Sequence, residues 1–515
     1  MKKTLALILA MLMLVGCLAG CGDKKPDNAG DGQLDKITIG LMSWPTDLDP
    51  ARSMGKTRTR TLFQIFDTLL YTKSDGTYGS YICESWGMKD DVTAEFKLKK
   101  GITFHNGDPL TAKDVQYSFE RIFNDTEGYL DKNIVNIMRT ITKVEAVDEL
   151  TVRITTETPD PIIFGRVASI LGVYIIPKDY VEEVGYEAFA VQPIGTGPYM
   201  MTAPLTAEKI ELTYYEGYYG EAPIAKNMEY RNFTEEAAMV TALINGEVDL
   251  VPDLGATAAE MVASRGLQTF SEPYSAAHLI RLNTTSPTGA TYDKKVRQAL
   301  SLAINRKLLV DTLWQGEYAF VPNGYNYTEF GPYYVPDYPE YEYNLEKAKQ
   351  LVAESTYDGR EIVFQMKSGY YPMMNEAAEA MVDMWKDAGL NVKIEFVESL
   401  AWLDDVHMMP WSNGLTFSDP LGGLGSHWSA TSSIQKNWWP APARFNELLA
   451  EMETETDPTA RRELYREVMQ IWDEEVPALL MYCPNAIWAM REGLSWEYTP
   501  GYAFNFRAEN LRIAE

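Results

Sequence analysis

The feature that most constrains the fold is a repeated order of segments, in which an amphipathic helix is followed by a glycine turn and a strand. In residues 375–398 (NEAAEAMVDMWKDAGLNVKIEFVE), Asn375 is expected to cap a helix with one apolar stripe. Gly389 is expected to end this helix, and the alternating residues 392–396 are typical of a strand. Helices that feed strands after short turns predict α/β domains with largely covered sheets.

The same order recurs in other parts of the chain. Thr234 is expected to cap a helix that Gly246 ends, just before the apolar segment EVDLVPDL. Residues 294–313 indicate two helices that meet near Asn305. The chain has 515 residues, of which 46% are hydrophobic, so it can bury large cores. At about 100–200 residues per domain, we expect two or more lobes.

A polar stretch at residues 99–115 (KKGITFHNGDPLTAKDV) carries a histidine and two aspartates. Its Asn-Gly pair favours a turn, and the spacing of Thr111 and Asp114 is that of a capping box at a helix start. His105 has no nucleophile beside it and no second histidine nearby. We therefore interpret the stretch as a turn followed by a helix, not as a catalytic loop.

The first residues predict export from the cytoplasm. Two lysines precede an apolar run at residues 5–15, which is too short to span a bilayer but has the length of a signal-peptide core. The sequence LAGC resembles the lipobox of bacterial lipoproteins, so we expect a signal peptide at residues 1–20 and a lipid on Cys21. A flexible tether is expected at residues 21–35, and LVGC, ending at Cys17, remains an alternative lipidation site.

Composition and motifs argue against several classes of protein. The formal net charge of −27 disfavours binding to nucleic acid. No GxSxG or HExxH motif occurs, the four histidines lack metal-ligand spacing, and Cys83 and Cys483 form no CxxC pair. We therefore expect no catalytic residue, no metal site and no cofactor.

Several segments together resemble one known family. The segment CESWGMKDDVTAEFKLKKGITFHNGDPLTAKDVQYSFERI is similar to the signature of the family 5 extracellular solute-binding proteins, the receptors of peptide- and nickel-type ABC importers. Other similar segments follow in the family's order, including WPTDLDP, FDTLLYTKSDG, PIGTGPYMM, VRQALSLAINR and DPTARRELYREVMQIWDEEVPALLMY. The resemblance covers nearly the whole chain after the tether.

The resemblance implies an α/β, two-lobed fold of the periplasmic-binding-protein type, with an extra small domain and a hinge between the lobes. Lobe I would combine residues 36–66, 190–281 and 492–515; the small inserted domain would hold residues 67–189, and lobe II residues 282–491. The expected function is capture of a small solute between the lobes and its delivery to an ABC permease. We expect a monomer that its lipid holds on the outer face of the cell membrane.

The resemblance also places candidate ligand-binding residues in three stretches, where aromatic side chains would provide contact area and polar groups would orient the solute. These residues are Arg52, Ser53 and Met54; Tyr274 and His278; and Trp411, Thr416, Phe417, Asp419 and Trp428. Guanidinium groups such as that of Arg52 suit a ligand carboxylate, and indole rings suit stacking on planar groups.

One position departs from the pattern of the peptide receptors in this family. In those receptors an aspartate three residues before the DP or EP pair binds the α-ammonium group of the peptide. The matching position before Asp419-Pro420 is Thr416, whose neutral hydroxyl cannot compensate the desolvation of an ammonium group. This argues against a standard peptide with a free N-terminus, unless Asp419 or another carboxylate takes that role.

Two other functions stay open from the sequence alone. A receptor of signals or a chaperone with the same fold would need no permease. A lipoprotein hydrolase would need a nucleophile and a base, and the neighbouring pair Ser426 and His427 is the nearest approach to one.

Overall fold

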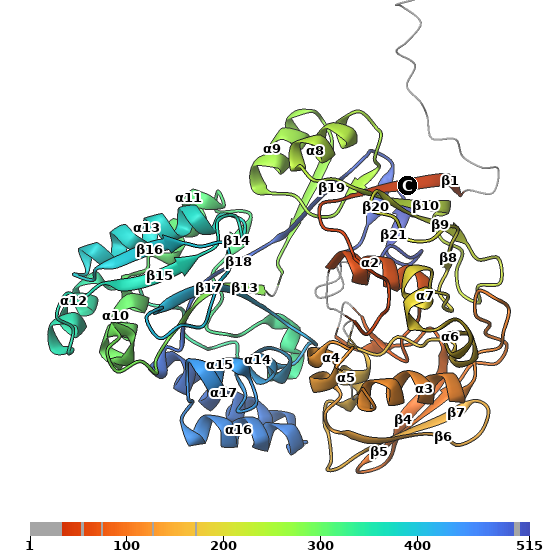
Figure 1. The fold of residues 1–515 in the computed structure, drawn as a ribbon, viewed down its shortest axis with the longest axis horizontal. Coiled ribbons are helices and arrows are strands. Elements are labelled where there is room, and N and C mark those ends of the chain that lie inside the picture. Colours follow the sequence, from red (N-terminus) through yellow and green to blue (C-terminus); the bar gives the residue numbers. More distant parts are fainter. Residues whose placement is uncertain are drawn as a thin grey trace, which may run out of the picture.

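The structure is a computed structural model, and its two largest bodies lie side by side (Figure 1). It describes residues 33–52, 56–73, 76–125, 128–169, 172–274, 276–498 and 505–514. The expected signal peptide, Cys21 and most of the tether lie outside these residues. Within the described ranges, every helix is too short or too polar to traverse a bilayer.

Lobe I is the body built around a seven-stranded sheet with the order β12-β19-β11-β1-β10-β9-β8. β1 pairs in parallel with β10 and β11, whereas β19 is antiparallel to β11 and β12. The strands are β1 (Leu34–Leu41), β8 (Tyr199–Met201), β9 (Lys209–Tyr214), β10 (Ala225–Asn232), β11 (Leu250–Val251), β12 (Gln268–Glu272) and β19 (Ala486–Met490). Its helices are α2 (Lys56–Ile65), α8 (Glu236–Ile244) and α9 (Ala256–Ser264), and a short hairpin adds β20 (Leu494–Trp496) and β21 (Leu511–Ile513).

Lobe II surrounds a six-stranded sheet with the order β14-β18-β13-β17-β15-β16. The strands are β13 (Ala276–Leu282), β14 (Ala319–Phe320), β15 (Ile362–Met366), β16 (Val392–Phe396), β17 (Met408–Gly414) and β18 (Ala478–Pro484). The helices are α10 (Lys294–Ala303), α11 (Arg306–Leu313), α12 (Leu345–Glu354), α13 (Met374–Asp387), α14 (Ser426–Trp428), α15 (Ser433–Asn437), α16 (Ala443–Thr454) and α17 (Pro458–Glu475). Short helical turns lie at η1 (Ala290–Tyr292), η2 (Thr328–Tyr333) and η3 (Leu421–Gly425).

The small domain is built on a four-stranded antiparallel sheet with the order β4-β5-β7-β6. Its strands are β4 (Cys83–Asp90), β5 (Thr93–Leu98), β6 (Ile141–Ala146) and β7 (Thr151–Thr156), with the hairpin β2 (Tyr71–Thr72) and β3 (Tyr78–Gly79) beside them in sequence. Its helices are α3 (Ala112–Phe123), α4 (Lys132–Ile137), α5 (Ile163–Val167), α6 (Lys178–Val184) and α7 (Tyr186–Val191). α3 packs on β6 and β7 and so covers one face of the sheet.

Two neighbouring strands carry the chain from one lobe to the other. β12 leads into β13 through residues 273–275, and β18 leads into β19 through Asn485 alone. The sheets therefore divide the chain near residues 274 and 485, whereas the sequence placed the limits of lobe II at 282 and 491. The difference has a physical reason: β13 pairs with β17 and β18 of lobe II, while β19 pairs with β11 and β12 of lobe I.

The local expectations were met at most element ends, but not at two helix starts. Asn305 caps α11, and Gly389 has a φ of 87° between α13 and β16. The prediction that Asn375 caps α13 was wrong, because the helix begins one residue earlier and the Asn375 amide donates to Ser368 instead. The prediction for Thr234 was also wrong, since the extended residue before α8 is Glu235.

The stretch at residues 99–115 has the structural role that its turn and cap signals indicated. The Thr111 backbone N–H donates to the Asp114 carboxylate at 2.9 Å, and the Lys113 N–H donates to the Thr111 hydroxyl, which completes the capping box of α3. The strand β5 ends at Leu98, and the chain then turns at Gly101, which has a φ of 81°.

His105 joins the small domain to a loop of lobe I. The Gly195 N–H donates to its Nδ1 at 3.2 Å, so Nε2 carries the proton that bonds the Gly197 carbonyl at 3.0 Å. Burial lowers the pKa of His105 to about 4, which keeps the ring neutral at physiological pH. A side chain at Gly195 would lie 2.2 Å from the Ile65 carbonyl oxygen, so only glycine allows this loop to approach α2.

Candidate functional site

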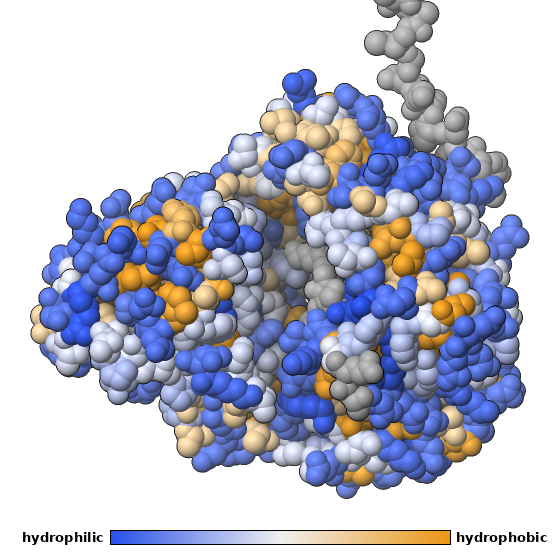
Figure 2. All heavy atoms as spheres, viewed as in Figure 1, coloured by the Kyte–Doolittle hydropathy of each residue, from blue (hydrophilic) through white to orange (hydrophobic). Residues whose placement is uncertain are grey.

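The molecular surface is hollowed between lobe II and the rest of the molecule (Figure 2). Below this hollow, in the view of Figure 1, α14 of lobe II packs against α4 of the small domain. The two strand crossings lie on another side of the same gap (Figure 1). Lobe I, lobe II and the small domain therefore all border the space in which the sequence resemblance expected a ligand.

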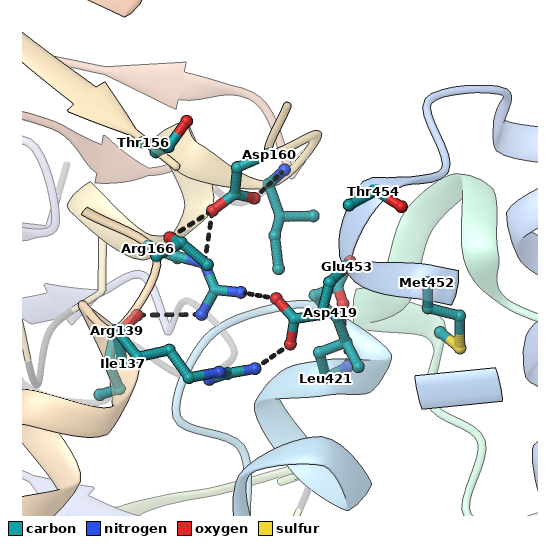
Figure 3. Close-up of polar contacts among 12 residues, drawn as sticks. Ile137, Arg139, Thr156, Asp160, Arg166, Asp419, Leu421, Met452, Glu453 and Thr454 are labelled. Atoms are coloured by element: carbon teal, nitrogen blue, oxygen red, sulfur yellow. Dashed lines mark hydrogen bonds and ion pairs between the residues drawn. The ribbon is translucent and has the colours of Figure 1, made fainter. Parts of the chain in front are cut away.

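A cluster of charged side chains holds the small domain to lobe II (Figure 3). Glu453 of α16 forms ion pairs with both Arg139 and Arg166 of the small domain. Arg166 is fully buried, and its Nε also donates to Asp160 at 2.8 Å. Burial, together with the neighbouring Arg166, lowers the pKa of Arg139 to about 10. One acid of lobe II thus compensates two cations across the boundary.

The loop after β17 reaches the same boundary, and the hydroxyl of its Thr416 is engaged within the loop. The Thr416 hydroxyl donates to the Gly422 carbonyl at 2.9 Å and lies 3.0 Å from the Ser426 hydroxyl. The Thr416 carbonyl accepts a hydrogen bond of 2.6 Å from Ser169 of the small domain. The ring of Phe417 lies 5.5 Å from the guanidinium carbon of Arg166. Both residues therefore border the small domain.

Asp419 lies inside lobe II, where its carboxylate is paired. Its Oδ2 accepts from Nη1 of Arg461 at 2.6 Å, and its Oδ1 accepts from Nη2 at 2.8 Å. The Leu421 N–H adds a third hydrogen bond of 2.9 Å, and both charged side chains are almost completely buried. The carboxylate nearest in sequence to Thr416 therefore has both oxygens engaged within the fold.

The two tryptophans that the sequence selected have different environments. Trp428 is completely buried; its indole N–H donates to the Asn413 side chain at 2.8 Å, and its ring packs edge-on against Trp472. Trp411 is only half-buried, and its ring centre lies 5.2 Å from that of His427 and 5.9 Å from that of Trp428. Trp411 therefore presents surface, whereas Trp428 supports it from behind.

The strand β13 carries one predicted residue and one that sequence reasoning missed. His278 is 6% exposed and lies between Tyr371 and Tyr482. Three positions later, the guanidinium carbon of Arg281 lies 4.4 Å from the ring centre of Trp402 and 4.9 Å from that of Trp411. The signal that could have found Arg281 is an arginine inside the mostly apolar and buried strand AAHLIRL.

The remaining predicted residues lie nearer the strand crossing and the small domain. Tyr274 is half-buried, two positions before the start of β13. The Arg52 guanidinium lies 4.0 Å from the Tyr129 ring centre and 3.5 Å from the Glu187 carboxylate. Ser53 and Met54 fall outside the described residues. The arginines that follow them in the basic segment are buried and form ion pairs, Arg58 with Asp47 and Arg60 with Asp253.

Metal and thiol chemistry find little support in the described part of the chain. No group of three histidine, cysteine, aspartate or glutamate side chains there is arranged to hold a metal ion. Cys83 and Cys483 are buried free thiols. Burial raises the pKa of Cys83 to about 12, so this thiol stays protonated and is a poor nucleophile.

Among curated proteins, the oligopeptide-binding protein AppA of Bacillus subtilis is 25% identical over 545 residues, which cover 97% of each chain. Among solved structures, the periplasmic binding protein DppA of Helicobacter pylori, in complex with the peptide STSA, is 21% identical with a TM-score of 0.80, covering 93% of this chain and 98% of that one. The binding protein AgaA of A. tumefaciens R10, in complex with agropinic acid, is 22% identical with a TM-score of 0.78, covering 93% and 99%.

These similarities confirm the α/β, two-lobed fold that the resemblance implied. The family described as "Bacterial extracellular solute-binding proteins, family 5 Middle" matches this chain over residues 78–435, which is more than half of its length. The matched residues include β13 and the loop from Trp411 to Trp428. They also include the small domain, apart from its first strand. The chain therefore belongs to family 5 of the bacterial extracellular solute-binding proteins.

Proposed function

We propose that this protein is the extracytoplasmic receptor of an ABC importer, which captures a small organic solute between its lobes and delivers it to the permease. The observation that carries the proposal is the pair of strand crossings, β12 to β13 and β18 to β19, between two separate sheets. Two bodies joined in this way can rotate about a few residues while each sheet stays intact. No covalent chemistry is part of the proposal.

The class of solute is suggested by proteins that share the family or the fold. AppA of B. subtilis is named for oligopeptides, and the structures of DppA and AgaA hold a peptide and agropinic acid. A space bordered by three bodies, with aromatic and charged side chains near it, suits a polar organic molecule.

The candidate residues take different parts in this proposal. The partly accessible residues would touch the solute, namely Arg52, Tyr274 and Trp411, and the almost completely buried Thr416 and Phe417 would form the border with the small domain. Those buried behind them would hold the shape of the site, namely His278, Asp419 and Trp428. Ser53 and Met54 remain proposed on the resemblance alone.

A lipid on Cys21 would keep the receptor on the outer face of the cell membrane, near its permease. Labelling of cells with radioactive palmitate should mark the protein and fail for Cys21→Ala. Continued labelling of that variant, with loss in Cys17→Ala, would move the lipid to the alternative site.

Native mass spectrometry of freshly purified protein tests the capture of a solute. We expect a monomer with a bound small molecule that dissociates on denaturation, and small-angle scattering should show a more compact particle when that molecule is added back. The proposal fails if the returned molecule is chemically altered, or if saturation with it leaves the radius of gyration unchanged.

A further inference from the structure

The guanidinium of Arg281, on β13, has aromatic neighbours but no acid among the described residues. It lies between the rings of Trp402 and Trp411 and is partly accessible, while its Nε is buried and has no hydrogen-bond partner. Within the ranges that the structure describes, no carboxylate lies within ion-pair distance of it. An arginine can neither accept a hydrogen bond nor lose its proton at physiological pH. The Arg281 guanidinium therefore stays charged without a carboxylate from those ranges to neutralise it.

Other buried arginines of the molecule show what Arg281 lacks. Each of the following reaches a carboxylate: Arg58 with Asp47, Arg121 with Asp49, Arg166 with Asp160, Arg297 with Glu475, Arg461 with Asp419 and Arg507 with Asp67. Arg306 has carbonyl and hydroxyl partners, donating to Leu480 at 2.7 Å and to Ser301. A desolvated cation without any such partner is costly, and the fold tolerates it here on indole faces alone.

The contacts of Trp411 connect Arg281 to the boundary between lobe II and the small domain. Trp411, on one side of the guanidinium, also contacts His427 of α14, and α14 packs against α4 of the small domain. On the other side, Trp402 is 38% exposed. The phenols of Tyr370 and Tyr371 lie close enough to act on Arg281 electrostatically, and no acid does so as strongly. Burial lowers the pKa of Arg281 to about 10, so it remains charged at neutral pH.

Two residues of the loop after β17 are already engaged within lobe II. The hydroxyl of Thr416 is engaged by Gly422 and Ser426, and both oxygens of Asp419 are engaged by Arg461. Neither Thr416 nor Asp419 therefore offers a free group to a cationic ligand.

We propose that the solute is an organic carboxylate, whose carboxylate pairs with Arg281 and whose planar or apolar part packs against Trp402 and Trp411. This inference rests on the proposed receptor function and specifies its ligand. A guanidinium binds a carboxylate through two parallel hydrogen bonds, and the indole faces hold it in place for that contact. A singly charged carboxylate is favoured over a phosphate dianion, because the chain carries a formal net charge of −27.

Matched pairs of probes test the charge preference on the full chain. Indole-3-acetate and indole-3-acetamide form one pair, and N-acetyl-L-phenylalanine and its amide form the other; tryptamine and phenyl phosphate represent a cation and a phosphate. Isothermal titration calorimetry should give each carboxylate a Kd at least about tenfold lower than that of its amide, and tryptamine and phenyl phosphate should bind more weakly still.

Two variants assign any preference to one side chain. In Arg281→Gln the carboxylate and the amide of each pair should bind equally weakly, while circular dichroism should show an unchanged fold. The control Arg360→Gln removes a partly accessible arginine of the same lobe that is paired with Asp358, and it should keep the preference. Equal binding within the pairs for the unaltered chain, preference retained in Arg281→Gln, or no binding of any carboxylate at millimolar concentration would each overturn the proposal.

Failure of this inference can be told apart from failure of the receptor function. If native mass spectrometry finds a neutral or cationic solute, and that solute compacts the protein in scattering, the carboxylate is wrong and the receptor function stands. If the protein neither retains a solute nor changes its radius of gyration with any probe, both proposals fail.

Discussion

Two arginines of lobe II have opposite environments. Arg461 is buried with Asp419 as a two-bond ion pair, and its Nε donates to the Met452 carbonyl at 2.9 Å, so its donors are used within the fold. Arg281 has two indole faces, those of Trp402 and Trp411, and no acid.

The difference teaches how to separate a cation that the fold needs from one that is available to a solute. Removal of a partner from a buried pair leaves an uncompensated charge, which makes both members indispensable once they are present. A cation without an acid contributes little to stability, and it can pair with an anion from outside the fold. Four predictions test this distinction.

The largest effect is expected for Arg461→Met. The variant leaves Asp419 buried without its cation, and the free energy of unfolding should fall by about 3–5 kcal/mol. Urea denaturation followed by tryptophan fluorescence measures the change. The double variant Arg461→Met with Asp419→Leu should recover most of the loss, because no buried charge remains. A single variant as stable as the parent would show that the pair is not structural.

The next effect concerns His105, which is buried like Arg461 but can release its proton. Burial lowers its folded-state pKa to about 4 from an ordinary value of 6.5, so the unfolded chain binds more protons between these values. The contribution of His105 to the free energy of unfolding is therefore complete above pH 6.5 and is lost as the pH falls toward 4. The full loss from this residue is about 3 kcal/mol.

Urea denaturation of the parent and of His105→Gln at pH 7, 5.5 and 4.5 measures this dependence. The loss of stability on acidification should be smaller in the variant by about that amount. Parallel pH profiles for the two proteins would mean that the ring is not held neutral.

A smaller effect is expected for Glu453→Gln, at the boundary between lobe II and the small domain. The amide keeps the shape of the side chain but not the charge that faces Arg139 and Arg166, so their contact should weaken by about 1 kcal/mol. Small-angle scattering without solute should then show a larger radius of gyration. Glu463→Gln, which removes an acid paired with Arg466 within lobe II, is the matched control and should change nothing. An equal expansion in both variants would contradict the role of Glu453.

The smallest effect is expected for the stability of Arg281→Gln. Loss of the contacts with the indole rings is offset by relief from burying a cation, so the free energy of unfolding should stay within about 1 kcal/mol of the parent. The same urea denaturation used for Arg461→Met gives a direct comparison. A loss as large as in Arg461→Met would make Arg281 a structural residue and remove the distinction between the two.

The local elements of this protein could be predicted from the sequence because each depends on groups a few residues apart. The capping box of Thr111 and Asp114 and the cap at Asn305 are hydrogen bonds between near neighbours. The ordered segments of the family, from WPTDLDP to the last helix, likewise indicated the two-lobed fold. The helix starts at Asn375 and Thr234 were missed: Met373 and Glu235 hold the cap positions, and the Asn375 amide donates to Ser368 instead of capping α13.

Tertiary structure alone decided which charged groups are already used. Asp419 meets Arg461 across 42 positions, and Asp67 meets Arg507 across 440, so no local pattern distinguishes these arginines from Arg281. The sequence by itself determined that the chain is an α/β protein with the signature of a solute-binding family. Whether a given cation is neutralised by the fold depends on which distant segments pack together, and that packing left one guanidinium of lobe II with indole rings as its neighbours and no acid.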